Sequence, residues 1–518
     1  MRRNNRREFL AGVGRGMLIA GVGYQVALDI GLSPALADDG SETLSFGALE
    51  PMVALIQETP VNRILPIVVE RIQGGTDIRE IVAAAALANA REFGGEDYIG
   101  FHTFMALSPA YHMAQELPSE RRPLPVLKVL YRNSTRMHEF GGRPREVLHP
   151  VKVATLAEGH SAAELVRDAV HRRDLGAAEQ ALAASAARSA EDAFNDLLPA
   201  VHDNDDVHRI VLAHRAYDML ELVGKERAET MLRQSLRYCV KNEEHAVNHS
   251  REVRTLLPKL LDQYGLLGKP RGTRQADDAW VEQMSQTLFT LTAAQAAEAV
   301  AGSLAEGMDP VAVAEAISLA ANQLVLRDSG RPAAQAQPNK PIGSVHGDSI
   351  GVHACDSANA WRHIAMVSNH RNMVASLIMS GYQMARDRVE RGGDFLEWKP
   401  RPFAEQLEAI ATRDGDTLLK ELEGAIREQQ QDRACALVQC YGQQGYDARP
   451  VFNLLLKFAI SEDGALHAEK YYRTTSDEFA STRPAFRWRQ LVALARVTAS
   501  EFGRPAPGYA EACELLKV

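Results

Sequence analysis

The stretch that decides the fold is GTDIREIVAAA, residues 75–85, in which a glycine ends one helix and an aspartate caps the next. The pattern predicts a helix that begins just after Asp77, because an aspartate at this position accepts hydrogen bonds from the first amides of a helix. Two further stretches share it, GMDPVAVAEA at residues 307–316 and GYDARPVFNL at residues 445–454. The prolines of these two copies are compatible with the first turn of a helix.

Each copy follows an amphipathic helical segment, such as residues 65–72 or 422–428, and a degenerate fourth copy lies at residues 173–174. Repetition on this scale predicts a helical-hairpin module used four times. The spacing of the copies groups the modules in pairs, so we expect a first helical half over residues 38–268 and a second over residues 273–518.

The composition favours helix throughout. Only 6% of the residues are aromatic, alanine is abundant, and long runs of alternating β-branched residues are absent from the sequence. We therefore predict an all-α fold of four repeated modules arranged as two halves. A segment rich in Pro, Gly, Ala and Gln, residues 327–348, is predicted to be a long loop that covers a site or lacks fixed structure.

Charge and cysteine content exclude several classes of protein. The net charge of −9 argues against a nucleic-acid partner, since such partners require a basic surface. The five cysteines show no C-x-x-C spacing, which leaves a zinc ribbon or a c-type haem attachment unsupported.

The N-terminus carries the three parts of an export signal, and its segment Arg6-Arg7-x-Phe9-Leu10 resembles the twin-arginine (Tat) class. We expect residues 1–37 to be removed after the Ala-Leu-Ala of residues 35–37, leaving a periplasmic or extracellular protein. The Tat export machinery would then be a partner. Arg15 and Asp29 interrupt the apolar stretch, which argues against a membrane span.

A histidine is expected to open a helix downstream of each copy of the module. The four are His102, His214, His353 and His467. The first and third share the pattern I-G-[FV]-H, and each has a second histidine ten residues on, His112 and His363. Imidazole binds Fe, Cu or Zn, so four equivalent histidines that converge would form a metal site. The same groups could instead serve as acids and bases, or each could simply cap its own helix.

Three of these histidine segments resemble the questin-oxidase-like family. The carriers of the resemblance are Gly100-Phe101-His102 with Ala110-Tyr111, His467-Ala468-Glu469-Lys470 behind Glu462-Asp463-Gly464, and His353 followed by Ala360 and Arg362. The resemblance implies a helical, monooxygenase-like oxidoreductase, the named member of the family opening an anthraquinone ring with NADPH and oxygen. NADPH is doubtful for this chain, because it carries no nicotinamide fingerprint and an export signal conflicts with a cytoplasmic reductant.

Two hypotheses of different classes follow. The first is an exported helical oxidoreductase acting on a small molecule, with a transition metal (Fe, Cu or Zn) as candidate cofactor. Its metal ligands would be His102, His214, His353 and His467, its catalytic residues His102, His353, His467 and Lys470, and its supporting residues His112 and His363. The second is a non-catalytic helical-repeat scaffold or binding protein. Convergence of the four histidines would favour the first.

Overall fold

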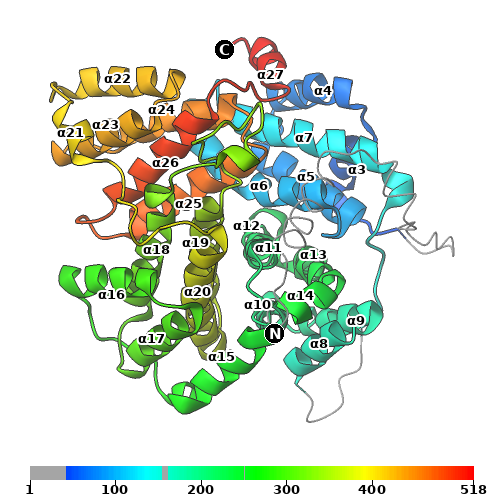
Figure 1. Cartoon of the computed structure of the whole chain (residues 1–518). Helices are drawn as coiled ribbons and strands as arrows, with labels where there is room; N and C mark the ends of the chain where they lie inside the picture. The colour runs from blue at the N-terminus through cyan, green and yellow to red at the C-terminus, as the bar shows by residue number, and fades with distance from the viewer. Residues whose placement is uncertain (1–42, 154–160, 250) are drawn as a thin grey trace. The chain divides into compact units, whose positions relative to one another are not determined.

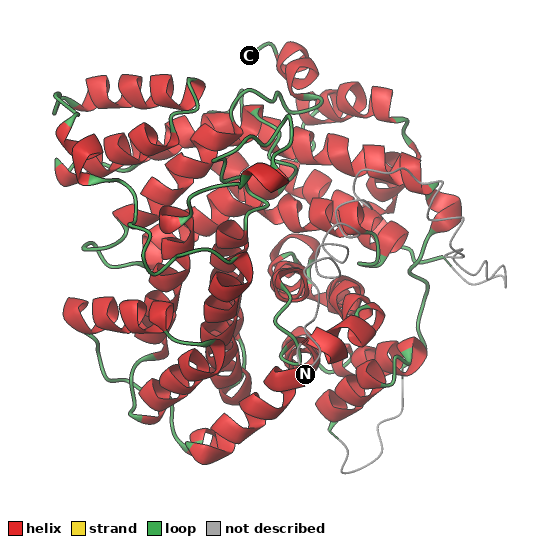
Figure 2. Ribbon diagram, in the orientation of Figure 1, coloured by secondary structure: helices red, strands yellow, loops and turns green. Residues whose placement is uncertain are grey.

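A computed structural model of the chain describes residues 43–153, 161–249 and 251–518 (Figure 1). The predicted signal peptide, residues 1–37, lies outside the described residues. Within them, Leu44–Val518 forms one compact unit. Its regular elements are helices, and Figure 2 shows no strand among them. The all-α class is confirmed.

A first series of helices runs up to the predicted boundary near residue 268. They are α3 (Glu50–Glu58), α4 (Val61–Gln73), α5 (Ile78–Phe93), α6 (Tyr98–Gln115), α7 (Leu124–Phe140), α8 (Ala162–His171), α9 (Leu175–Ala186), α10 (Ala190–Val201), α11 (Val207–Asp218), α12 (Leu220–Val223), α13 (Ala228–Lys241), α14 (Glu243–His249) and α15 (Arg251–Gln263).

A second series continues to the C-terminus. It comprises α16 (Asp278–Thr290), α17 (Ala293–Ala305), α18 (Pro310–Arg327), α19 (Ile350–Val367), α20 (His370–Arg391), α21 (Ala404–Glu408), α22 (Gly415–Arg427), α23 (Gln431–Gln443), α24 (Arg449–Ser461), α25 (His467–Ser481), α26 (Trp488–Glu501) and α27 (Tyr509–Leu516). None of the helices in the described part of the chain is long and apolar enough to cross a membrane.

The aspartates of the repeated stretches start helices as predicted. Asp77 accepts a hydrogen bond from the amide of Arg79 at 2.8 Å at the start of α5, and Asp309 accepts one from Val311 at 3.0 Å at the start of α18. At the start of α24, Asp447 accepts one from the amide of Arg449 at 2.7 Å. These bonds satisfy amides that have no partner within the helix.

The residue two places before each aspartate turns the chain between helices. Gly75, Gly307 and Gly445 have φ angles of +98°, +83° and +75°, in the region that favours glycine. In the degenerate copy the residue just before Asp174 is Arg173, which takes a left-handed φ of +56° without being a glycine. Asp174 still caps α9, accepting from the amide of Ala177.

Three groups of four consecutive helices pack in the same order. In α4–α7, α17–α20 and α23–α26 the first helix packs against the fourth, the second against the third, and the third against the fourth. The region between α8 and α13 differs, because the additional helix α10 lies between α9 and α11. The shared order is consistent with a repeated module, and the four-module arrangement stays a prediction.

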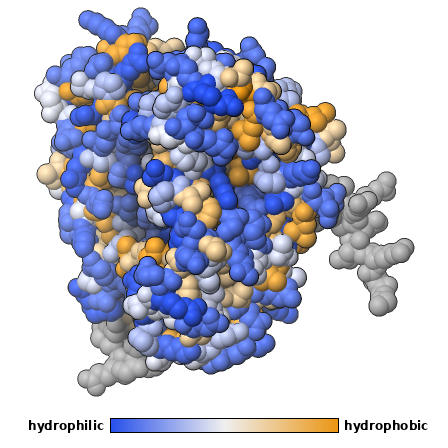
Figure 3. Space-filling view, turned by 90° about the vertical axis from the view of Figure 1, so that its left-hand side faces the viewer, coloured by the Kyte–Doolittle hydropathy of each residue, from blue (hydrophilic) through white to orange (hydrophobic). Residues whose placement is uncertain are grey.

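Four helices that are distant in sequence form a closed set of neighbours. Helix α6 packs on α11, α11 on α19, α19 on α25, and α25 on α6. The first two come from the first predicted half and the last two from the second. Figure 3 shows one mainly hydrophilic face of the molecule with scattered hydrophobic residues.

Candidate metal centre

The N-terminal ends of α6, α11, α19 and α25 meet, and each end contributes one histidine. His102 is the fifth residue of α6, His208 the second of α11, His353 the fourth of α19, and His467 the first of α25. We call these four residues the histidine ring. Three of them, His102, His353 and His467, are among those predicted from the sequence.

The four imidazoles surround a common centre in chain order. The distances between neighbouring ring centroids are 4.9 Å for His102 and His208, 5.9 Å for His208 and His353, 5.3 Å for His353 and His467, and 5.5 Å for His467 and His102. The Nε2 atoms of His353 and His467 are 3.2 Å apart.

Three ring histidines are held by their Nδ1 atoms. Nδ1 of His102 lies 2.7 Å from the carbonyl oxygen of Tyr98, and Nδ1 of His467 lies 3.1 Å from that of Ala465. Because a carbonyl only accepts, both nitrogens carry the proton and both Nε2 atoms keep a lone pair. Nδ1 of His208 lies 3.3 Å from Oδ1 of Asp206. This arrangement is the one that fixes the tautomer of metal-binding histidines.

On the opposite edge of two imidazoles, the Nε2 atom lacks a hydrogen-bond partner among the described residues. Nε2 of His102 and Nε2 of His208 are buried and have no hydrogen-bond partner in the described structure. A buried polar atom without a partner costs free energy, and in a native protein it calls for an explanation. Nε2 of His467 already keeps a lone pair, so the Nε2 of His353 beside it must either donate a proton or share a cation with it.

Burial keeps the imidazoles of three ring members, His102, His353 and His467, uncharged. It lowers the pKa of His102 and of His467 well below the ordinary value, and the ammonium of Lys470 adds to both effects. Burial also lowers the pKa of His353 to about 3, with His208 as the next cause. The positive ends of four helices act in the same direction. Neutral imidazole is the form that binds a metal ion.

A second polar layer lies one helical turn along from the ring. Lys470 follows His467 by three residues on α25, and Asp356 follows His353 by three residues on α19. Burial lowers the pKa of Lys470 to about 8, while Asp356 opposes this shift. Burial raises the pKa of Asp356, whose Oδ1 accepts a 2.8 Å hydrogen bond from Thr474 Oγ1.

The predicted loop of residues 327–348 packs beside the ring. The amide of Val345 donates to Ser500 Oγ at 2.9 Å, and that of Gly347 donates to Glu501 Oε1 at 2.8 Å. The backbone of Gly347 comes so close to His467 that a Cβ at this position would lie 2.3 Å from the Cβ of His467. The end of the loop therefore closes one side of the site.

The members of the ring differ in burial. His208 and His353 are only partly buried, whereas His102 and His467 are 4% and 6% exposed. The ring of Tyr98, a residue with 57% exposure, lies with its centroid 4.4 Å from that of His102. The less buried edge of the ring is therefore formed by His208, His353 and Tyr98.

His214 does not belong to the ring, which corrects the sequence prediction. It lies six residues after His208 on α11, which is about 9 Å along a helix. There its imidazole stacks on His363, with the centroids 4.8 Å apart and an angle of 14° between the planes. His208 takes the place predicted for His214.

A sequence signal could have identified His208. It follows Asp206, the residue that caps α11 and accepts a hydrogen bond from the amide of His208 at 3.1 Å. The ring histidines all lie within the first five residues of their helices, whereas His214 is the eighth residue of α11. Distance from the capping residue is therefore the criterion that separates them.

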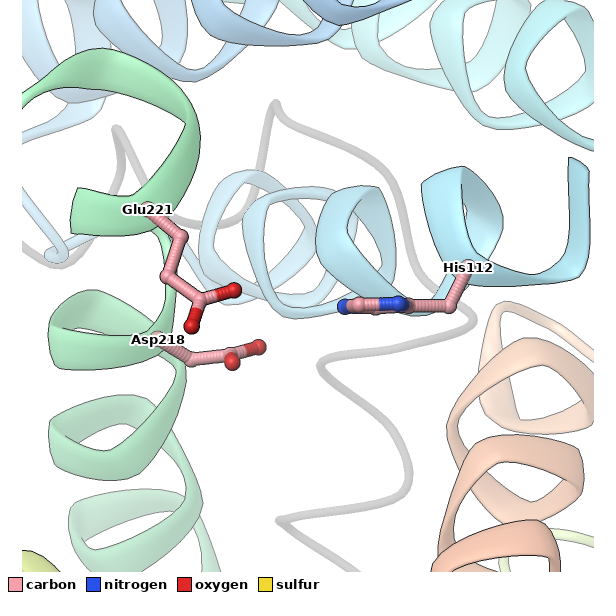
Figure 4. Close-up of side chains that lie close together, drawn as sticks. All are labelled: His112, Asp218 and Glu221. Carbon is pink, nitrogen blue, oxygen red and sulfur yellow. The ribbon is translucent and has the colours of Figure 1, made fainter. Parts of the chain in front are cut away.

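His112 and His363 do not touch the ring either. Each lies ten residues, or about 15 Å of helix, beyond its ring histidine. His112 faces Asp218 and Glu221, as Figure 4 shows, and His363 Nε2 lies 3.5 Å from Asp477 Oδ2. This distance corrects the prediction that His112 and His363 support the histidine ring.

The group of His112, Asp218 and Glu221 differs from the histidine ring in how closely its candidate ligand atoms approach one another. Those of His112, Asp218 and Glu221 all lie within 4.8 Å of one another, but the glutamate is exposed. No three nitrogens of the histidine ring are that close in the described structure. The ring is therefore wide, and a single ion bound to all four imidazoles would draw opposite members together.

Comparisons with known proteins give no family for the chain. No family model, no curated protein and no solved structure matches it. The chemistry of the site therefore has to be argued from its own residues.

Proposed function

We propose that the chain binds a transition-metal ion through the Nε2 atoms of the histidine ring and acts as an oxidoreductase. The observation that carries the proposal is the ring itself, four imidazoles brought together by four helix ends. The buried Nε2 atoms of His102 and His208, which have no hydrogen-bond partner among the described residues, are the observation that most directly favours a cation bound between the rings.

The donor set fits Fe, Cu or Zn. Imidazole nitrogen suits each of these ions, and no thiolate or carboxylate is needed among the direct ligands. Four neutral ligands leave the full charge on the ion, which would then polarise a bound small ligand or lower the pKa of bound water. Asp206 would orient His208, and the carbonyl oxygens behind His102 and His467 would orient those two.

Lys470 is the residue best suited to move a proton near the ring. Its pKa of about 8 is close to neutral pH, so both its forms are accessible. Asp356 and Thr474 hold the polar layer in which it lies. The imidazoles of His102 and His467 are poor proton carriers at neutral pH, since burial keeps them uncharged.

The remaining parts of the proposal rest on the sequence. The oxidoreductase class comes from the resemblance of the segments around His102, His353 and His467 to the questin-oxidase-like family. Export through the Tat machinery, which carries folded proteins, allows a cofactor to be loaded before export. A small-molecule substrate is proposed, and NADPH is not part of the proposal.

Metal analysis of the purified protein tests the proposal. We expect about one transition-metal ion per chain, a tenfold or greater loss in His208→Ala, and full occupancy in His214→Ala, because only the first removes a ring ligand. Oxygen consumption with candidate phenolic or quinone substrates should follow the metal content. Less than about 0.2 ions per chain in the wild-type protein, after attempted loading with each metal, would contradict the proposal and favour a scaffold.

A further inference from the structure

A cavity of about 510 Å³ opens between the 327–348 loop, α21, the start of α23 and Arg496 of α26. Its residues are distinct from those of the histidine ring. A volume of this size is typical of pockets for small metabolites.

The lining of this cavity is positively charged. Arg401, Arg433 and Arg496 contribute to it, with Asp432 as the one acidic member of the lining. Asp432 is already engaged, since its Oδ1 accepts a 2.5 Å hydrogen bond from Nε of Arg401. Arg433 is paired as well, its Nη2 lying 2.6 Å from Oε2 of Glu421, so among the described residues Arg496 is the cation of the lining without a carboxylate partner.

Arg496 is the least exposed of the three arginines. It is 1% exposed, and its two terminal nitrogens donate to the carbonyl oxygens of Val325 and Asp328. Its Nε has no hydrogen-bond partner in the described structure. Burial, with Arg401 as the next cause, lowers the pKa of Arg496 to about 10. A negative charge in the cavity would offset the cost of burying this cation.

The N-terminus of α23 opens onto the same cavity. Gln430, the residue at its N-cap, makes no side-chain cap, and the amides of Asp432 and Arg433 have no acceptor among the described residues. Both residues line the cavity. Amides at a helix start, together with the positive end of the helix, form a ready site for an anion.

We propose that this cavity binds a small, non-aromatic oxyanion, a phosphate ester or a polycarboxylate. Arginine and free amides recognise the oxygens of both groups. No aromatic side chain lines the cavity on which a flat ring could stack, while Oε1 of Gln431 is buried without a hydrogen-bond partner in the described structure and can accept from a hydroxyl group of such a metabolite. The proposal is independent of metal binding at the histidine ring.

Calorimetric titration of the purified protein with inorganic phosphate and, separately, with citrate tests the proposal. We expect saturable binding of at least one of them with a Kd below about 1 mM. Arg433→Gln should weaken binding about tenfold by removing one charged donor. Ala409→Glu, at an exposed position of the lining, should abolish it by placing a negative charge in the cavity without disturbing the core.

The matched control is Arg172→Gln, which removes an exposed arginine from the C-terminal end of α8, outside the lining. It should leave the Kd unchanged within about twofold. Citrate binding without phosphate binding would assign the site to polycarboxylates, and the reverse to phosphate esters. No heat with either anion at millimolar concentration, or an equal loss of affinity in Arg172→Gln and Ala409→Glu, would overturn the proposal.

Discussion

Three of the four helices, α6, α11 and α19, carry a second histidine at a far level, and the groups that face these histidines differ from those at the histidine ring. At the histidine ring, imidazole faces imidazole, and the carbonyl and carboxylate partners lie behind the rings. At the far level, His112 faces Asp218 and Glu221, while His363 faces Asp477 and stacks on His214. Arg473 also pairs with Asp477 there, at 3.0 Å.

This difference separates a site from a structural contact. A carboxylate in front of a histidine gives the ring N–H an acceptor, so the contact satisfies itself. Two facing imidazole nitrogens that both keep a lone pair have no such solution, so either one of them takes up a proton and donates it to the other or a cation lies between them. The partner of each histidine therefore decides its role.

The largest expected effect is loss of metal on removing two ring histidines. His353→Ala combined with His467→Ala should reduce the metal content from about one ion per chain to below about 0.1, because two neutral ligands cannot hold the ion. Mass-spectrometric metal analysis measures this. His112→Ala, at the far level of α6, is the control and should keep its metal. Equal losses in both variants would erase the distinction between the levels.

The second-largest effect is expected at Asp206, whose carboxylate lies behind the imidazole of His208. Asp206→Asn keeps a good helix cap but removes the charge that orients the imidazole, so the affinity for the metal should fall about 10- to 100-fold. Competition with a chelator gives the affinity. Asp477→Asn makes the same chemical change at the far level and should leave the affinity unaltered. A larger loss in Asp477→Asn would reverse the comparison.

The pH dependence of the free energy of unfolding tests whether burial keeps His353, a member of the histidine ring, uncharged. The pKa of His353 is about 3 in the folded protein against an ordinary value of 6.5. Between these values the unfolded chain binds more protons than the folded one, so the free energy of unfolding attributable to His353 falls as the pH is lowered from 6.5 towards 3. In metal-free protein, His353→Asn should therefore reduce the loss of Tm between pH 7 and pH 5. Parallel Tm profiles for both proteins would show that His353 titrates normally.

The smallest effect is expected at the far level. The side chain of His363 is 37% exposed, so its contact with Asp477 is partly screened by water. His363→Gln should change the free energy of unfolding by less than about 1 kcal/mol, measured by urea denaturation. Metal content should stay the same. A loss of several kcal/mol would mean that the far level holds the four helices together.

Much of the fold could be predicted because its signals are local. The aspartates at positions 77, 309 and 447 start helices in the structure as they do in the pattern, through bonds to amides two residues away. The 327–348 loop was predicted as a segment, but its packing against Ser500 and Glu501 depends on α26, more than 150 residues distant.

The candidate site was predicted in part. His102, His353 and His467 were predicted as histidines at helix starts downstream of a module, and the structure brings them together. The number of residues between a module's aspartate and its ring histidine varies from 20 to 44, so spacing does not identify the ring member of the second module. His214 was expected to open a helix, whereas the capping residue Asp206 places the start of α11 beside His208.

The sequence by itself determined that this chain is helical and where several of its helices begin, because capping, turn geometry and periodicity act over a few residues. Only the tertiary structure decided which histidines meet. Their neighbours come from helices up to 365 residues apart, as for His102 and His467, and no local signal records that separation. Burial and the absence of a facing carboxylate, both products of packing, then distinguish the ring from every other histidine pair described in the chain.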